Sequence, residues 1–246
     1  MTVSKKYFYA LAISNLMSWA VIVLLWTTSN TRSYSNEFEE ITVEKLNVVN
    51  ERGKVVMTIS NKHKIPGPTF GGTEYPQAFG DGRQNLSGII FFNEQGDEVG
   101  GLVYNGFPVE NRHWAGGHLS FDQWKHNQVV ALQYLDNGSS KRAGLRIWDR
   151  PTESEFKDFL DVGLERMNEP DQSKRDSLRS TMNTMRQEGL LGTERMFVGS
   201  QNGNAQVQIR DTEGNIRIRL TVDETDEAKL VFLNENGDQV ASYPDH

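Results

Sequence analysis

The sequence predicts a mainly β protein, with antiparallel hairpin repeats in a sandwich or open barrel, an inserted helical hairpin and one N-terminal transmembrane helix. Three observations support this fold class. A long uncharged apolar stretch lies near the N-terminus, and a polar turn ending in glycine recurs between β-rich runs. After residue 152, the spacing of apolar residues changes from that of a strand to that of a helix.

The apolar stretch from Tyr7 to Trp26 is long enough to cross the hydrocarbon core of a bilayer. A cleaved secretory signal is the alternative, because Lys5 and Lys6 form a basic region before it. The length of the stretch and the lack of a small-residue cleavage site favour an uncleaved anchor. The two lysines favour a cytoplasmic N-terminus, hence a single-pass protein of the cytoplasmic membrane.

The span and the turns together divide the chain into expected parts. These are a cytoplasmic tail at 1–6, a transmembrane helix at 7–28, a tether at 29–40, and an extracytoplasmic β domain at 41–246 with a helical insertion at 152–190. The lipid bilayer is therefore an expected partner of residues 7–28. Within the span, Ala10, Ser14 and Ser18 form a ladder of small residues, so a homo-oligomer through this face is a further hypothesis.

Four β-hairpins are predicted by a shared turn in which Asn or Asp is followed three residues later by glycine. The side chain of the first residue caps such a turn, and glycine takes the left-handed conformation at its end. The four turns are Asn50 to Gly53, Asn93 to Gly96, Asp211 to Gly214 and Asn234 to Gly237. None has the ligand spacing of a calcium-binding EF-hand loop.

Two further patterns describe the expected strands. Ile216, Ile218 and Leu220 alternate with arginines, which predicts one face in the core and one in water. The run from Ile89 to Phe92 lacks this alternation and is expected to be buried on both faces. Three more strands are expected at 117–122, 129–135 and 142–149.

Two helices are predicted between these strands and the last two hairpins. Phe156, Phe159 and Leu160 begin an amphipathic pattern over 152–167, and Thr152 with Glu155 forms a capping box at its start. A second helix is expected at 171–188. Such a pair could dock a partner, but the width of its apolar stripes favours packing on the sheet.

Composition excludes several classes of function. The chain has 246 residues, no cysteine and a net charge of -7. Thiol catalysis and iron–sulfur clusters are therefore excluded, and the negative charge argues against a nucleic-acid partner. The sequence contains no P-loop, dinucleotide-binding, serine-hydrolase or zinc-protease motif, and it predicts no cofactor and no metal site at the turns.

The densest group of candidate catalytic residues lies between His113 and His126. If 117–122 is a strand, His118 and Asp122 share one face, where they could act as an acid–base pair or as metal ligands, with Asp149 as a third candidate. A simple solvent-facing role is the favoured alternative, because positions i and i+4 of a strand lie about 13 Å apart.

Two long segments rich in glycine and proline, 61–86 and 105–117, are expected to be loops with a role in ligand or partner binding. Both carry aromatic and arginine side chains, which often anchor interfaces. The candidate binding residues are Phe70, Tyr75, Arg83, Arg112 and Trp114. The alternative is that the aromatic residues close the ends of the β structure.

Several segments, among them IIFFNEQGDEVGGLVY, GGHLSFDQW and AGLRIWDRP, resemble those of a group of bacterial membrane-anchored or secreted β-hairpin-repeat proteins of unknown function. The resemblance implies a bacterial cell-envelope setting and transfers no catalytic residue. The leading expectation is a non-enzymatic binding or scaffold module with an envelope protein as a candidate partner. The alternative is an envelope hydrolase or a metal-dependent enzyme.

Overall fold

The computed structural model describes residues 5–29, 38–79 and 82–245. The chain forms two compact units, Met1–Thr42 and Val43–His246. The expected tail at 1–6 and tether at 29–40 lie largely outside the described residues.

The first unit contains the helix α1 (Lys5–Ser29). Its segment Tyr7–Leu25 has a mean hydropathy of 2.0, so α1 is long and apolar enough to cross a membrane, although signal sequences share these properties. The Ser18 hydroxyl donates a hydrogen bond to the Ser14 carbonyl oxygen at 2.9 Å, so this polar side chain is satisfied within the helix.

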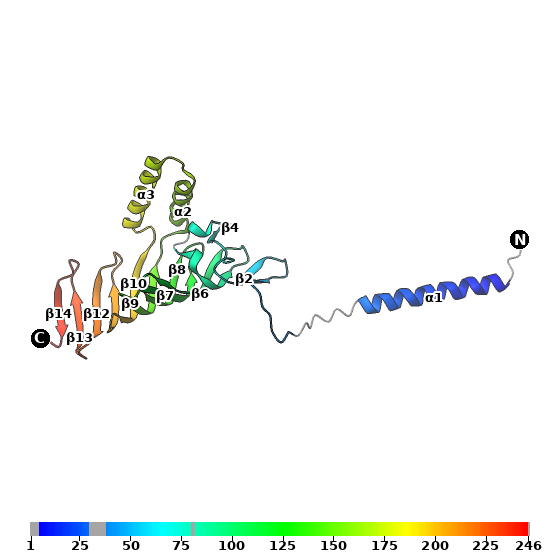
Figure 1. Ribbon diagram of the computed structural model, residues 1–246, viewed down its shortest axis with the longest axis horizontal. Helices are drawn as coiled ribbons and strands as arrows, with labels where there is room; N and C mark the ends of the chain where they lie inside the picture. The colour runs from blue at the N-terminus through cyan, green and yellow to red at the C-terminus, as the bar shows by residue number, and fades with distance from the viewer. Residues whose placement is uncertain (1–4, 30–37, 80–81, 246) are drawn as a thin grey trace. The chain divides into compact units, whose positions relative to one another are not determined.

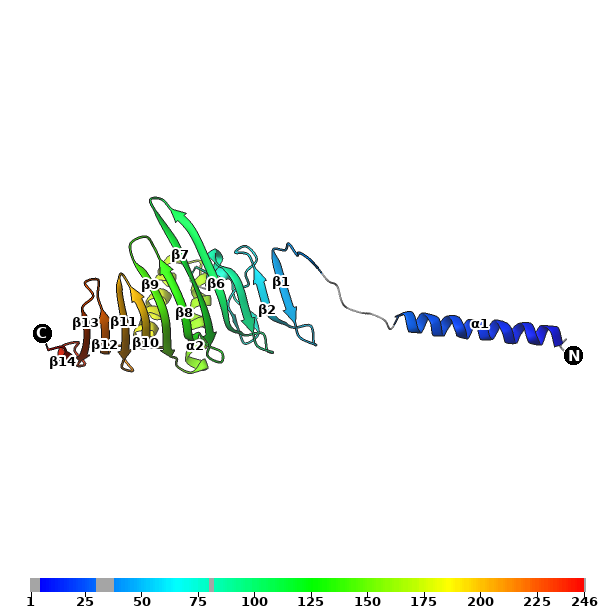
Figure 2. The ribbon, with the colours of Figure 1, turned by 90° about the horizontal axis from the view of Figure 1, so that it is seen from below.

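The second unit is built on one antiparallel sheet of 12 strands, in which each strand pairs with the strands before and after it in the sheet (Figures 1 and 2). The strands are β1 (Lys45–Val49), β2 (Val55–Ser60), β5 (Ser87–Phe92), β6 (Glu98–Val109), β7 (Arg112–Asp122), β8 (Gln128–Asp136), β9 (Lys141–Asp149), β10 (Thr193–Gln201), β11 (Asn204–Arg210), β12 (Ile216–Val222), β13 (Ala228–Leu233) and β14 (Gln239–Tyr243). The mainly β, antiparallel prediction is confirmed. The sheet is not closed, and the other sheet among the described residues is a hairpin of two short strands, so neither a closed barrel nor a sandwich is confirmed.

Two insertions interrupt the sheet. Between β2 and β5 lie the short hairpin β3 (Thr69–Phe70) and β4 (Thr73–Glu74) and two 3-10 turns, η1 (Gln77–Phe79) and η2 (Arg83–Asn85). Between β9 and β10 lie the helices α2 (Glu153–Asn168) and α3 (Gln172–Gln187). Both insertions stand over the same face of the sheet, which we call the helix-bearing face (Figure 1).

The helical insertion begins as its sequence predicts. Thr152 caps α2 in a capping box with Glu155, and Asp171 caps α3 by accepting a hydrogen bond from the backbone N–H of Lys174 at 2.9 Å. Phe156, Phe159, Leu160 and Met182 are buried. The apolar stripes therefore face the protein rather than solvent.

The four predicted hairpin turns are all present. In each, the first side chain accepts two backbone N–H bonds; Asn93 Oδ1, for example, accepts from Gln95 at 2.8 Å and Asp97 at 3.0 Å. The glycines that end the turns have φ of 76°, 91°, 93° and 84°. Because L side chains rarely adopt these angles, glycine is required there.

The predicted loop at 105–117 is wrong. These residues belong to the long β6–β7 hairpin, where Tyr104 pairs with Gly117 and Asn105 with Gly116. A Cβ at Gly117 would lie 2.7 Å from the Val103 carbonyl oxygen. Its lack of a side chain therefore reflects close approach between strands rather than a loop.

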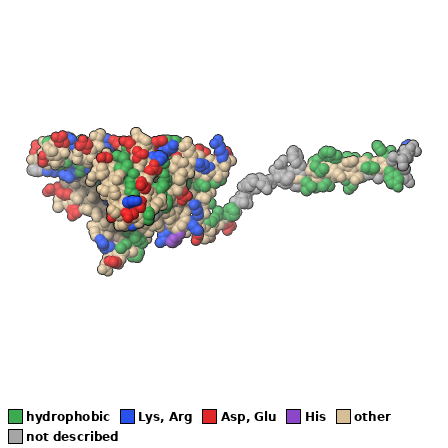
Figure 3. Space-filling model, turned by 90° about the horizontal axis from the view of Figure 1, so that it is seen from above, with side chains coloured by type: hydrophobic (Ala, Val, Ile, Leu, Met, Phe, Trp, Pro, Cys, Tyr) green, Lys and Arg blue, Asp and Glu red, His purple; other side chains and the backbone are tan. Residues whose placement is uncertain are grey.

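The core of the sheet lies on the helix-bearing face, where Ile65, Ile90 and Val103 form a buried cluster. Charged and apolar side chains are interspersed over the exterior of this side (Figure 3). Ile89 and Phe91, whose burial on both faces is predicted, are only half-buried because they point to the opposite, open face.

The open face of the sheet faces the viewer in Figure 2. Two rows of directly paired residues run along this face across all 12 strands. We call the first row the apolar ladder. It consists of Leu46, Ile59, Ile89, Leu102, Leu119, Leu132, Leu145, Val198, Val207, Leu220, Leu230 and Tyr243. The second row is Val48, Met57, Phe91, Gly100, Phe121, Val130, Ile147, Met196, Ile209, Ile218, Phe232 and Ala241. The alternation predicted for β12 is present, but Leu220 is 46% exposed, so its row is not in the core of the single chain.

Candidate functional site

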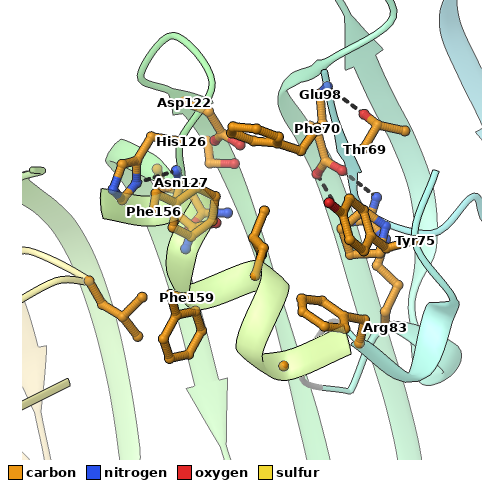
Figure 4. Close-up of a pocket in the computed structure, with 18 of the residues that line it drawn as sticks. Thr69, Phe70, Tyr75, Arg83, Glu98, Asp122, His126, Asn127, Phe156 and Phe159 are labelled. Atoms are coloured by element: carbon orange, nitrogen blue, oxygen red, sulfur yellow. Dashed lines mark hydrogen bonds and ion pairs between the residues drawn. The ribbon is translucent and has the colours of Figure 1, made fainter. Parts of the chain in front are cut away.

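A pocket of about 420 Å³ lies between the helix-bearing face and the two insertions (Figure 4). The sheet strands β5, β6 and β7 supply its floor, the insertion after β2 supplies one wall, and α2 and α3 supply the cover. Segments far apart in the sequence thus meet around one cavity, the arrangement typical of a ligand site.

The apolar part of the pocket is aromatic. The rings of Phe70 and Phe156 meet edge to face with centroids 6.0 Å apart, and those of Tyr75 and Phe79 are 5.2 Å apart. Phe159 lies below Phe156 on α2 and is covered by the guanidinium of Arg186 at 5.0 Å. Such walls suit a planar or aliphatic part of a ligand.

An ion pair between Arg83 and Glu98 fixes the insertion after β2 to the sheet. Arg83 Nη1 and Nη2 donate to the two Glu98 carboxylate oxygens at 2.9 and 2.5 Å, and both side chains are almost completely buried. Arg83 Nε also donates to the Pro66 carbonyl oxygen, and Thr69 Oγ1 accepts from the Glu98 backbone N–H. Because three of its five N–H donors are used within the protein, the main role of Arg83 is to shape the pocket.

Asp122 enters the pocket from the end of β7 (Figure 4). Burial, reinforced by the negative charge of Glu98, raises the pKa of its carboxyl group to about 7, against the opposing effects of Arg150 and Arg83. Its Oδ1 atom is buried and has no hydrogen-bond partner. Asp122 is therefore a carboxyl group with free bonding capacity that changes protonation near neutral pH.

His126 follows in the turn after β7 and is 5% exposed. Its ring stacks on Phe156, with centroids 4.1 Å apart and an interplanar angle of 22°. Burial and the charge of Arg150 lower its pKa to about 4, so the imidazole is neutral at pH 7. Since Nδ1 accepts the Asn127 backbone N–H at 2.7 Å, the proton is assigned to Nε2, which has no partner.

A third unpaired polar atom, Arg166 Nε on α2, belongs to another residue that lines the same pocket. Native proteins rarely leave buried polar atoms unpaired, and such atoms commonly mark the place of a water or ligand. Asp122 Oδ1, His126 Nε2 and Arg166 Nε form what we call the unpaired trio.

The structure brings five of the eight candidate residues into this pocket: Phe70, Tyr75, Arg83, His118 and Asp122. Burial and the charge of Arg83 lower the pKa of His118, so it is also neutral at pH 7. Among the described residues, no group of three His, Asp or Glu side chains is placed to hold a metal ion. His118 and Asp122 both line the pocket, and each side chain can take part in hydrogen bonding and proton transfer.

The other three candidates lie outside the residues that line this pocket. Arg112 and Trp114 are in the far part of the β6–β7 hairpin, where they pair with Val109 and Phe107. Asp149 is in an ion pair with Arg195 and is largely exposed.

Sequence reasoning missed His126, Glu98 and Phe156 as parts of the site. His126 lies in the histidine-rich segment that the sequence singled out, but its importance depends on contact with α2. Glu98 follows a hairpin turn and gives no signal until the fold places Arg83 beside it.

Comparison with known proteins adds no further assignment, because no family model, curated protein or solved structure matches the chain.

Proposed function

We propose that this protein is a membrane-anchored, extracytoplasmic binding module that holds a small, partly apolar molecule in the pocket beneath α2 and α3. The single observation that carries the proposal is the unpaired trio within an aromatic pocket. The length and apolarity of α1 support the membrane anchor, and Lys5 and Lys6, which precede its apolar segment, support the orientation.

The pocket chemistry defines the class of ligand. At pH below about 7, Asp122 is protonated and the trio offers mainly hydrogen-bond donors; above it, Asp122 becomes an acceptor with negative charge. A ligand with a carbonyl or hydroxyl group that bonds His126 Nε2 or Arg166 Nε, attached to an apolar body, satisfies both the polar and the aromatic parts of the pocket. Binding of such a group removes the cost of the buried unpaired atoms.

The test is extraction of small molecules from the full-length protein purified from its native membranes, followed by mass spectrometry. We expect the wild-type protein to carry a molecule that is depleted in an Asp122→Leu/His126→Leu double variant. Trp114→Ala is the matched control, because this residue lies outside the pocket lining and should not change the occupancy. Equal retention by all three proteins would refute the proposed site.

A second candidate function is acid–base catalysis in the same pocket, as in an envelope hydrolase. The observation that favours it is the pKa of Asp122 near 7, which suits a general acid or base at neutral pH. Asp122→Asn keeps the shape of the side chain, but the amide cannot donate or accept a proton as a general acid or base. If the protein is an enzyme, a molecule extracted from this variant should be converted when it is added to the wild-type protein; recovery of the molecule unchanged would contradict catalysis.

We also propose two kinds of protein partner for this chain. An envelope protein is a candidate partner. Self-association of the anchor through Ser14 and Ser18 is a hypothesis for the first unit, where the side chain of Ala10 lies outside the described residues. Replacing Ser14 with leucine should then weaken association of the full-length protein.

A further inference from the structure

The open face of the sheet has the composition of a protein interior but is exposed in the single chain. In the five central members of the apolar ladder, from Leu102 to Val198, the exposed fraction of the side chain is between 36% and 60%. The second row is also uncharged and includes Phe121, which is 55% exposed. Monomeric proteins rarely expose contiguous apolar surface on this scale.

The two faces of the sheet carry opposite chemistry, and this is clearest from β9 to β12. On the helix-bearing face, Arg142 and Arg146 form ion pairs with Glu194, and Arg146 Nη1 donates to Gln133 at 2.8 Å. These charged groups pair with one another on this face, whereas the aliphatic residues of the same strands point to the open face. The helix-bearing face already holds the core of the single chain, including Phe197. An apolar sheet face is normally packed against another layer, so the open face also requires a cover.

The dimensions of the open face match those of a stable protein interface. Strands lie about 4.8 Å apart and successive residues of one face about 6.8 Å apart, so two rows over the sheet cover about 750 Å². Two such surfaces together bury about 1,500 Å², which is the size of a typical specific interface. The two rows alone therefore reach the area of a typical specific interface.

The chemistry of the open face fits an identical surface better than a bilayer. Both rows are uncharged in all strands, so two copies can meet without placing like charges together. Proteins that lie on a membrane surface usually add basic residues around the apolar area to attract anionic lipids, whereas this chain has a net charge of -7.

We propose that two copies of this chain pack through their open faces, with the apolar ladders of the two sheets in contact about 10 Å apart. The predicted sandwich then arises between chains rather than within one. Ile89 and Phe91 also become buried from the second side, as the unalternating run from Ile89 to Phe92 suggests. The pockets lie on the outer faces of this dimer and stay accessible.

The centre of the twelve-strand order falls between β8 and β9, so Leu132 and Leu145 lie closest to the two-fold axis.

The test uses the full-length protein in its native membranes. Because the chain has no cysteine, Leu132→Cys introduces a single thiol. A bismaleimide of about 10 Å reach, matched to the spacing of packed sheets, should join two copies. Ser173→Cys on the exposed surface of α3 is the matched control and should give no product.

A second variant separates this interface from association through α1. Leu145→Arg, added to Leu132→Cys, places an unpaired charge at the centre of the interface and should lower the cross-linked fraction by about tenfold or more. Leu145 is half-exposed in the single chain, so the fold of each copy should be unchanged by circular dichroism. A Ser14→Leu variant should keep the Leu132→Cys product.

Two results would overturn the proposal. The first is no dimer at position 132, and the second is equal cross-linking at positions 132 and 173. In the first case, a bimane label on Leu132→Cys that reports an apolar environment would show that a lipid surface covers the open face.

Discussion

The imidazole of His126 stacks on the ring of Phe156, with centroids 4.1 Å apart. This contact joins the turn after β7 to the first turns of α2, so the cover of the pocket and its polar lining meet at one point. Removing either ring should therefore affect both the position of the helices and the pocket.

Phe156→Ala should remove this contact and the edge-to-face contact with Phe70. Loss of a buried phenylalanine usually costs about 3–5 kcal/mol. Because α2 and α3 are tied to the sheet mainly through the pocket, we expect faster amide hydrogen exchange in 153–187 than in β7 and β8. Uniformly faster exchange across the whole second unit would show that the hairpin does not move independently.

The pH dependence of stability should differ between Asp122 and His126. The folded protein raises the pKa of Asp122 from 3.8 to about 7, so its contribution to the free energy of unfolding falls as pH rises through this interval. The pKa of His126 is lowered from 6.5 to about 4, so its contribution rises between these values. Each limiting slope is about 1.4 kcal/mol per pH unit.

In the wild-type protein, these two slopes oppose each other between about pH 4 and 6.5. Asp122→Asn should leave a stability that rises with pH, and His126→Phe, which keeps an aromatic ring on Phe156, should leave one that falls. Urea unfolding at several pH values, followed by tryptophan fluorescence, measures both slopes. Parallel curves for the two variants would contradict the assigned pKa shifts.

Removing only one partner of the Arg83–Glu98 ion pair should lower the stability of the protein strongly. Arg83→Met leaves the carboxylate of Glu98 buried without its partner, which typically costs about 3–5 kcal/mol. A double variant, Arg83→Met/Glu98→Leu, should be less destabilised than Arg83→Met, because it leaves no unpaired charge. A double variant that is at least as destabilised as Arg83→Met in thermal unfolding would show that the two side chains do not act as a pair.

Removing the capping box of α2 should lower the stability of the protein by a smaller amount, through a local change at the start of the helix. Thr152→Ala removes the hydroxyl that bonds Glu155 and the first turn of the helix, and should lower stability by about 1 kcal/mol. Thr152→Ser keeps the hydroxyl and should be close to wild type. Equal losses in both variants, measured by urea unfolding, would place the role of Thr152 in its methyl group rather than in the cap.

Much of the secondary structure could be predicted from local patterns. The Asn and Asp turns, the capping box at Thr152 and the period of α2 each depend on residues a few positions apart. The segment around Gly116 and Gly117 was predicted wrongly as a loop, because its glycines are explained by close contact with a neighbouring strand.

The packing of layers on the sheet was harder to predict. The alternation at Ile218 and Leu220 shows that one face of the strand is apolar, but it does not show which element covers that face. The site was predicted in part. Tyr75 and Asp122 have residue types that are common in binding sites, but only the fold separates them from Trp114, whose side chain is equally suited to binding. His126 and Phe156 meet across long stretches of chain, and no local pattern records such a contact.

The most direct test of the pocket is an experimental structure of the full-length protein purified from its native membranes without added ligands. If the pocket binds a small molecule, we expect one continuous density, larger than water, within hydrogen-bonding distance of Asp122 Oδ1 or His126 Nε2 and against the ring of Phe70. A pocket that holds only separate waters bonded to these atoms, or that is filled by its own side chains, would contradict the proposed binding function.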